Sequence, residues 1–255
     1  MDVIQSAVLG VIEGFTEFLP ISSTAHMIIA SKAMGLSQTT YTKAFEIIIQ
    51  LAAILAVVFV YREKFSPKKI ELWKRLIVAY LPLAIVGFIF RHQIKELFST
   101  QVVAVMFIVG GVIFLIVEKF YKEKEHYVKD VEKVTYKQSL LIGIAQVFAL
   151  IPGTSRSGAS IIGGMLNGLD RRTSAEFSFL LALPVMITVS AYEFLKHYHE
   201  FSNENILTLI IGFVVSFIIA YLTIKLFLSF LKRFTFVSFG IYRILFGILL
   251  LYIGF

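Results

Sequence analysis

The sequence predicts an all-α polytopic membrane protein with about six full transmembrane helices and two re-entrant helix hairpins in an inverted-topology repeat. Three observations predict this class: an apolar excess, long uninterrupted apolar runs, and two apolar stretches broken by proline and hydroxyl residues. Of the 255 residues, 58% are apolar and 16% are charged, and the mean hydropathy is +0.83. Soluble domains carry about 25% charged residues. The excess apolar surface must therefore face lipid, and we expect the protein to lie in a bilayer.

Composition also excludes several classes of function. The chain has no cysteine, so disulfides, thiolate metal sites and cysteine nucleophiles are excluded. The net charge of +7 is typical of a membrane protein whose basic loops set its orientation, so no nucleic-acid partner is expected. The start, Met1-Asp2, lacks the basic region of a removable signal peptide, and we expect none.

Six apolar runs bounded by charge are long enough to cross a bilayer as helices, which takes about 20 residues at about 1.5 Å per residue. Barrel strands would instead show about ten residues of alternation. Gly110-Gly111 in the third run indicates close helix contact. The runs cover roughly 43–61, 73–90, 101–118, 176–195, 206–231 and 234–255.

Two further apolar stretches, about 3–35 and 138–169, are each broken near the middle. The breaks are Pro20-Ile21-Ser22-Ser23-Thr24 and Pro152-Gly153-Thr154-Ser155. The arms after the breaks are too short to cross a bilayer. We therefore interpret both stretches as re-entrant hairpins, whose irregular tips must line a cavity or be buried in protein. Kinked full spans are the alternative.

The two hairpins also resemble each other in sequence. At an offset of 133, Gly10 matches Gly143 and Glu13 matches Gln146, whereas Ser23 matches Ser155 at 132. The hairpins are therefore interpreted as copies of one repeat. We expect a single domain over 1–255, with repeat 1 at about 1–118 and repeat 2 at about 138–255.

Charge distribution indicates how the copies are oriented. The loops at 62–75 and 119–137 carry six Lys or Arg residues each, and we place them in the cytoplasm. Counting spans from these loops puts the ends of the first hairpin outside and the ends of the second inside. The repeats are therefore inverted, and their tips are expected to meet near the membrane centre.

The first hairpin contains three ionisable residues, Glu13, Glu17 and His26, which are costly in hydrocarbon and indicate function. Glu13 and Glu17 are four apart and share a helix face. Their charges repel unless a cation or a shared proton offsets them. His26 can carry protons or attack phosphorus. The structural alternatives are one protonated glutamate and a packed histidine.

The second hairpin carries Arg156 among small and hydroxyl residues. A guanidinium at this depth needs an anion, and its planar fork suits phosphate oxygens. An ion pair with Glu13 or Glu17 is the alternative. Both returning arms begin at the tips, so two helix N-termini converge there and favour an anion. Carboxylates, His26 and Ser23 beside them are the parts needed for hydrolysis, and a lipid head group is the simplest anion within a bilayer.

Three segments resemble one family, the undecaprenyl-diphosphate phosphatases, also called bacitracin-resistance proteins. EGFTEFLPISSTAH at 13–26 is similar to the family's first signature, PGTSRSGAS at 152–160 to its second, and EFSFLL at 176–181 also matches. The resemblance covers essentially the whole chain. Two positions depart from the pattern: Ala25 replaces a usual glycine and Ser160 a usual threonine. Both changes are small.

The resemblance implies hydrolysis of a polyprenyl diphosphate lipid to the monophosphate carrier of cell-wall synthesis, with bacitracin resistance when overproduced. It also implies dependence on a divalent cation, Mg or Ca, and a location in the plasma (cytoplasmic or inner) membrane with the site open towards the outer face. Glu17, Ser23, His26 and Arg156 match the catalytic residues, and Glu13 with Glu17 is expected to hold the cation. We expect the tips to bind substrate through Ser22, Thr24, Gly153, Thr154, Ser155, Ser157 and Ser160.

Several alternatives remain open on the sequence. The nucleophile is Ser23 activated by Glu17 or His26, His26 itself, or water, and we favour Ser23. A lipid-phosphate flippase or transporter would use the same inverted-repeat site without bond cleavage. The sequence does not indicate an oligomeric state.

Overall fold

The computed structural model describes residues 1–37, 39–197 and 206–254. The regular secondary structure of these residues is helical, apart from one isolated bridge between Val128 and Leu169. Most of the expected loop between the runs at 176–195 and 206–231 lies outside the described residues. The prediction of a helical membrane protein is confirmed at this level. Five helices in the described part are long and apolar enough to span a membrane: Tyr41–Val60, Pro67–Ile89, Thr100–Phe120, Arg171–Tyr192 and Ile206–Phe230.

The sixth expected run, 234–255, contains α11 (Val237–Ile253), an apolar helix of 17 residues. Its length is near the lower limit for crossing a bilayer. The count of six spans therefore stays a prediction.

The chain forms two compact units. The first unit comprises Met1–Phe18, Ser23–Phe65 and Ala182–Leu226, and the second comprises Leu19–Ser22, Ser66–Leu181 and Phe227–Phe255. The division into repeats of about 1–118 and 138–255 is a separate prediction that this grouping does not test.

The first unit contains α1 (Val3–Thr16), α2 (Ser23–Ala33), α3 (Thr40–Val60), η1 (Arg62–Phe65) and parts of α9 (Arg171–His197) and α10 (Ile206–Phe230). Asp2 and Gln5 form a reciprocal capping box that begins α1. Gly10 and Gly14 share a face of α1, and a Cβ at Gly14 would lie 2.5 Å from the carbonyl oxygen of Ser216. Small residues thus let the α1 backbone pack directly on α10.

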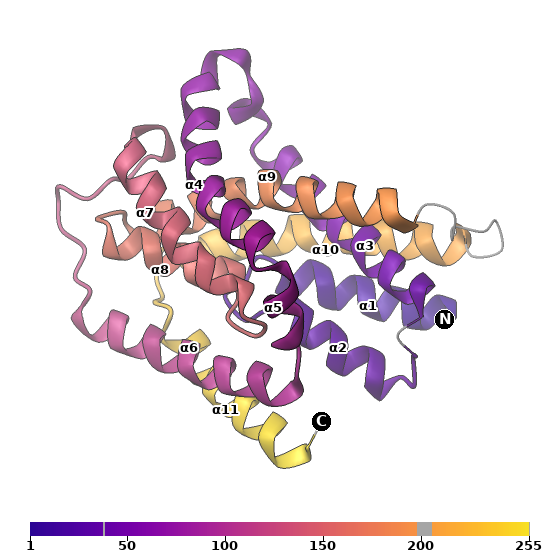
Figure 1. Cartoon of the computed structure of the whole chain (residues 1–255). Helices are drawn as coiled ribbons and strands as arrows, with labels where there is room; N and C mark the ends of the chain where they lie inside the picture. The colour runs from indigo at the N-terminus through magenta and orange to yellow at the C-terminus, as the bar shows by residue number, and fades with distance from the viewer. Residues whose placement is uncertain (38, 198–205, 255) are drawn as a thin grey trace. The chain divides into compact units, whose positions relative to one another are not determined.

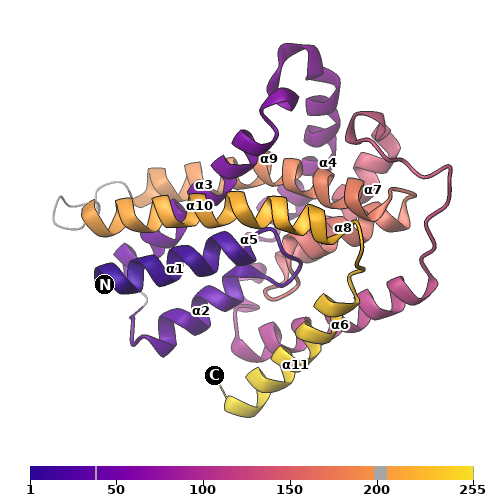
Figure 2. The ribbon, with the colours of Figure 1, turned by 180° about the vertical axis from the view of Figure 1, so that it is seen from behind.

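The second unit contains most of the remaining helices: η2 (Pro67–Lys69), α4 (Ile70–Ile89), α5 (Arg91–Glu96), α6 (Thr100–Phe120), η3 (Val131–Lys133), α7 (Tyr136–Val147), η4 (Phe148–Leu150), α8 (Arg156–Leu166), the start of α9, and α11. Helices α6 and α11 lie side by side in both views (Figures 1 and 2). A Cβ at Gly111 would lie 2.6 Å from the carbonyl oxygen of Gly240. The close helix contact predicted from Gly110-Gly111 is therefore confirmed.

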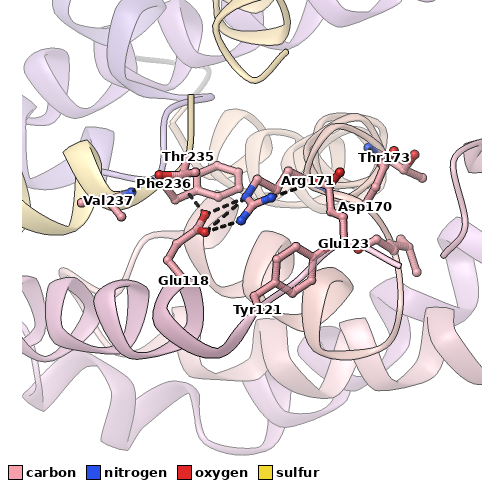
Figure 3. Close-up of polar contacts among 10 residues, drawn as sticks. Glu118, Tyr121, Glu123, Asp170, Arg171, Thr173, Thr235, Phe236 and Val237 are labelled. Atoms are coloured by element: carbon pink, nitrogen blue, oxygen red, sulfur yellow. Dashed lines mark hydrogen bonds and ion pairs between the residues drawn. The ribbon is translucent and has the colours of Figure 1, made fainter. Parts of the chain in front are cut away.

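An ion-pair network fixes the C-terminal end of α6 in the second unit (Figure 3). The buried carboxylate of Glu118 accepts hydrogen bonds from the Arg171 guanidinium, at 2.9 Å from Nε and 2.5 Å from Nη2, and from the Phe236 N–H at 2.9 Å. The same guanidinium lies 4.7 Å from the centre of the Tyr121 ring. Burial raises the pKa of Tyr121, and its hydroxyl donates to the Leu169 carbonyl. One acidic residue thus joins α6 to the starts of α9 and α11.

Candidate active site

The turn between α1 and α2, in the first predicted hairpin, brings the Ser23 hydroxyl against the Glu17 carboxylate. Helix α1 ends at Thr16 and α2 begins at Ser23, so the helix break lies at the predicted segment. Ser23 Oγ donates to Glu17 Oε2 at 2.5 Å, and both side chains are buried. This separation is at the short end for a hydroxyl bound to a charged oxygen. A hydroxyl held in this way by a base is the arrangement of an activated nucleophile.

Glu13 and Glu17 occupy one face of the same segment. The N–H of Glu17 donates to the carbonyl of Glu13, so helical geometry continues to Glu17 and the expected shared face is present. Glu13 is only 3% exposed. Within the described ranges, no group of three or more His, Asp or Glu side chains is placed to hold a metal ion. Two carboxylates still suit Mg²⁺, which usually takes one or two of them and completes its shell with phosphate and water. The donor set therefore fits a divalent cation.

His26 and Thr24 lie in the first turns of α2. The His26 side chain is half-buried and Thr24 is exposed. The first unit thus holds five of the predicted site residues: Glu13, Glu17, Ser23, Thr24 and His26. The roles of His26 and Thr24 stay predictions.

The second turn is built around Ser155, the residue before α8. Its side chain accepts from the Gly158 N–H at 3.1 Å and lies 3.1 Å from Ser157 Oγ. The backbone φ of Ser155 is +75°, and that of Ser22, the residue before α2, is +66°. These are the non-glycine residues with positive φ in the described chain. Ser22, rather than Ser23, is therefore the structural counterpart of Ser155.

These two serines are strained at matching places. A non-glycine residue in such a conformation costs on the order of 1–3 kcal/mol and persists only where the surroundings enforce it. Such residues concentrate at binding and active sites. Both turns thus have the backbone signature of a functional site.

Arg156 begins α8 and is tied to α9 within the second unit. Its Nη1 donates to the Ser178 carbonyl at 3.1 Å. Ser160 donates to the Arg156 carbonyl at 2.9 Å and lies 2.7 Å from the Ser178 hydroxyl. The fully buried Ser178, which belongs to the EFSFLL segment and had no assigned role, therefore supports both predicted residues.

The turns of the two hairpins are in contact in the second unit, which includes Leu19–Ser22. Ser157 Oγ donates to the Leu19 carbonyl at 2.8 Å. Gly153 has φ +89°, and a Cβ there would lie 2.5 Å from the Val103 carbonyl oxygen. The second unit holds the other predicted site residues: Ser22, Gly153, Thr154, Ser155, Arg156, Ser157 and Ser160.

Sequence reasoning assigned no role to Arg243 of α11, which donates hydrogen bonds to both turns. Its Nη1 donates to the Pro20 carbonyl at 3.0 Å, and its Nη2 donates to the Gly153 carbonyl at 3.0 Å and to the Met106 carbonyl at 2.9 Å. The available signal was an arginine inside the apolar run 234–255. The cost of an ionisable residue in hydrocarbon, stated above for Glu13, Glu17 and His26, applies equally to Arg243.

Comparisons with known proteins cover nearly the whole chain. The family profile of the bacitracin resistance protein BacA matches residues 6–249. An undecaprenyl-diphosphatase of Sulfurovum sp. (strain NBC37-1) is 66% identical over 99% of this chain and 100% of its own length. Relatives of the same name are 63% identical in Sulfurimonas denitrificans, over 98% of both chains, and 57% identical in Methanococcus aeolicus, also over 98% of both. The chain belongs to the bacitracin resistance protein BacA family.

Proposed function

We propose that the chain is a membrane phosphatase that hydrolyses undecaprenyl (polyprenyl) diphosphate to the monophosphate and inorganic phosphate. The observation that carries this proposal is the buried hydrogen bond from Ser23 to Glu17. Relatives named undecaprenyl-diphosphatase match 98–99% of the chain that contains this hydrogen bond. Family membership connects the same activity to bacitracin resistance.

Ser23 is the nucleophile in this proposal and Glu17 is its base. Ser23 Oγ attacks the terminal phosphorus while its proton passes to Glu17 Oε2. The new Oγ–P bond replaces the bond from phosphorus to the bridging oxygen, which leaves with the prenyl monophosphate. A water molecule then attacks the phosphoserine, releases inorganic phosphate and restores the Ser23 hydroxyl. His26 lies one turn beyond Ser23 and is assigned to proton transfer in these steps.

Arg156 and the turn residues bind the phosphates in this proposal. The guanidinium fork neutralises charge that grows on the phosphate oxygens in the transition state. The first N–H groups of a helix have no intrahelical partner. At the start of α8 the Gly158 N–H donates to Ser155 Oγ, and the N–H groups of Arg156 and Ser157 are assigned to the anion. Ser22, Thr24, Thr154 and the other predicted turn residues add hydroxyl or backbone donors. Their small side chains allow the phosphates to approach the backbone.

A divalent cation, Mg²⁺ or Ca²⁺, completes the proposal. Glu13 and Glu17 would hold it, since both are buried oxygen ligands on one helix face. When bound, it neutralises phosphate charge. Removing it with a chelator is expected to lower turnover without unfolding the chain.

The membrane arrangement is also proposed here. The arms that flank the turns are short, 14 and 11 residues in α1 and α2 and 12 and 11 in α7 and α8. Helices of this length support re-entrant hairpins, because about 20 residues cross a bilayer. With the basic loops in the cytoplasm, the hairpins form an inverted repeat in the plasma membrane, with the site open to the outer face.

Phosphate release by the purified protein tests the proposed function. The protein in detergent is given undecaprenyl diphosphate with Mg²⁺ or Ca²⁺, and released phosphate and bound lipid are both measured. We expect multiple turnovers in the presence of the cation. Protein that binds the lipid but releases no phosphate would contradict the phosphatase and favour the flippase or transporter.

A further inference from the structure

Arg243 is a fully buried arginine whose guanidinium reaches backbone atoms of three segments. Its side chain is 0% exposed. It donates to Pro20 in the first hairpin turn, to Gly153 in the second hairpin turn, and to Met106 in α6, at 2.9–3.0 Å. One side chain thus connects two turns that are about 130 residues apart in the sequence.

The partners of Arg243 are carbonyl groups rather than a carboxylate. Within the described chain its hydrogen bonds all go to backbone oxygens, and its Cζ lies 5.1 Å from the centre of the Phe107 ring. A buried charge without an opposite charge is costly, and a hydrophobic residue would pack α11 on α6 without that cost. Helix packing alone therefore does not account for an arginine at this position.

The helix opposite leaves room for the guanidinium. Gly110 of α6 faces Arg243, and a Cβ built on it would overlap Nη2. The adjacent Gly111 lets α6 approach α11 closely. The absence of a side chain at Gly110 thus leaves the space that the Arg243 guanidinium occupies.

The two turn carbonyls bound by Arg243 lie next to residues of the proposed reaction. Pro20 is three residues before Ser23, and Gly153 is three residues before Arg156. The strained residues Ser22 and Ser155 lie within these intervals and need surroundings that enforce their conformations. The guanidinium also binds the negative ends of the Pro20 and Gly153 carbonyl dipoles.

We propose that Arg243 is a positioning residue, which holds the two hairpin turns in the conformation that binds and cleaves the diphosphate. It acts through Pro20 and Gly153 and does not itself contact the substrate. This inference rests on the proposed function for its kinetic consequence, but its structural consequence is measured without turnover.

Four variants separate the fork of Arg243 from its charge and from helix packing. Arg243→Met removes both fork and charge, Arg243→Lys keeps the charge, and Gly110→Ala keeps the arginine but displaces its fork. Gly247→Ala is the matched control, because its Cβ would lie 2.8 Å from the Ala104 carbonyl oxygen and disturbs the same helix pair one turn away. Melting temperatures in detergent are measured for all four.

The kinetic readout is kcat and KM for undecaprenyl diphosphate. We expect kcat to fall about tenfold or more in Arg243→Lys and Gly110→Ala, and further in Arg243→Met, with KM within about threefold of the parent. Gly247→Ala should keep its kcat even if its melting temperature falls. The proposal would be overturned if Arg243→Lys and Gly110→Ala kept a near-parental kcat. It would also be overturned if kcat fell in all four variants in proportion to their melting temperatures.

The structural readout is amide hydrogen exchange measured by mass spectrometry. Peptides that cover 19–23 and 151–157 should exchange faster in Arg243→Lys and Gly110→Ala, whereas those of α7 should not change. Gly247→Ala should leave both turns unaffected. Unchanged exchange in the turns of both test variants would overturn the inference whatever the kinetics show. If the parent protein releases no phosphate, the proposed function fails and the exchange experiment still decides this inference.

Discussion

Ser23 and Glu17 form the hydrogen bond on which the proposed chemistry depends. Ser23→Ala removes the proposed nucleophile while leaving a small side chain in a buried position. We expect turnover to fall by at least about a thousandfold, because a nucleophile has no substitute in the proposed route. Phosphate release per folded protein measures the change.

Ser6→Ala is the control for this variant. Ser6 is also a buried serine of the first unit, and its hydroxyl donates to the Thr208 carbonyl. Losing that hydrogen bond should cost about 1 kcal/mol of stability and leave turnover unchanged. If Ser23→Ala retains most of the activity, the nucleophile is His26 or water.

Arg156 tests the phosphate-binding role of the second turn. Arg156→Ala should lower kcat/KM about a hundredfold or more, since a preorganised charge at the transition state is lost. Arg156→Lys should recover only part of it, because an ammonium lacks the planar fork. Michaelis constants and the melting temperature are measured together. Near-normal activity in Arg156→Ala would contradict the phosphate-binding assignment.

The sequence predicts which residue types form the site, but it does not predict their backbone conformations. Ionisable groups in apolar stretches identified Glu13, Glu17 and Arg156 without any contact being known. The positive φ of Ser22 and Ser155 was not predictable, because serine has no intrinsic preference for it and the surrounding packing imposes it. The matching φ values also show that Ser22, rather than Ser23, corresponds to Ser155.

The Glu118 network shows how single elements are stabilised. Glu118 joins the end of α6 to Arg171 of α9 and to the N–H of Phe236, the residue before α11 (Figure 3). Its side chain is 2% exposed. Removing one partner of a buried ion pair leaves the other charge uncompensated.

Glu118→Ala should therefore lower the free energy of unfolding by about 3–5 kcal/mol. The control is Glu71→Ala, which removes two exposed contacts, the pair with Lys74 on α4 and the hydrogen bond from the Tyr136 hydroxyl, and should change stability little. Unfolding in detergent, followed by circular dichroism, compares the two. Equal effects would show that the Glu118 pair is not a principal stabiliser of these helix ends.

Helix positions were predictable at this scale because apolar length and flanking charge report them directly. The runs at 43–61, 73–90 and 101–118 correspond to α3, α4 and α6. Which helices pack against each other was harder to predict from the sequence. Gly110-Gly111 indicated a close contact but not that α11 makes it, since that choice depends on packing between segments far apart in the chain.

The distribution of charge predicts the orientation of the whole molecule. Ser66 and Ser99 flank α4, so we expect one crossing between them, and the basic loop at 62–75 predicts that Ser66 is cytoplasmic. Cysteines introduced singly at these positions, in a chain that has none, should react with an impermeant reagent from opposite faces of the membrane. Labelling of both from one face would contradict the topology.

The most direct measurement for the central claim is the detection of phosphate on Ser23 during turnover. Protein mixed with undecaprenyl diphosphate and a divalent cation is quenched within a turnover, and its peptides are analysed by mass spectrometry. An alkaline quench is run in parallel, because phosphohistidine does not survive acid. The account predicts phosphoserine at Ser23, and none in Ser23→Ala. Turnover at a normal rate with phosphate on His26, or with no phosphorylated residue under either quench, would contradict it.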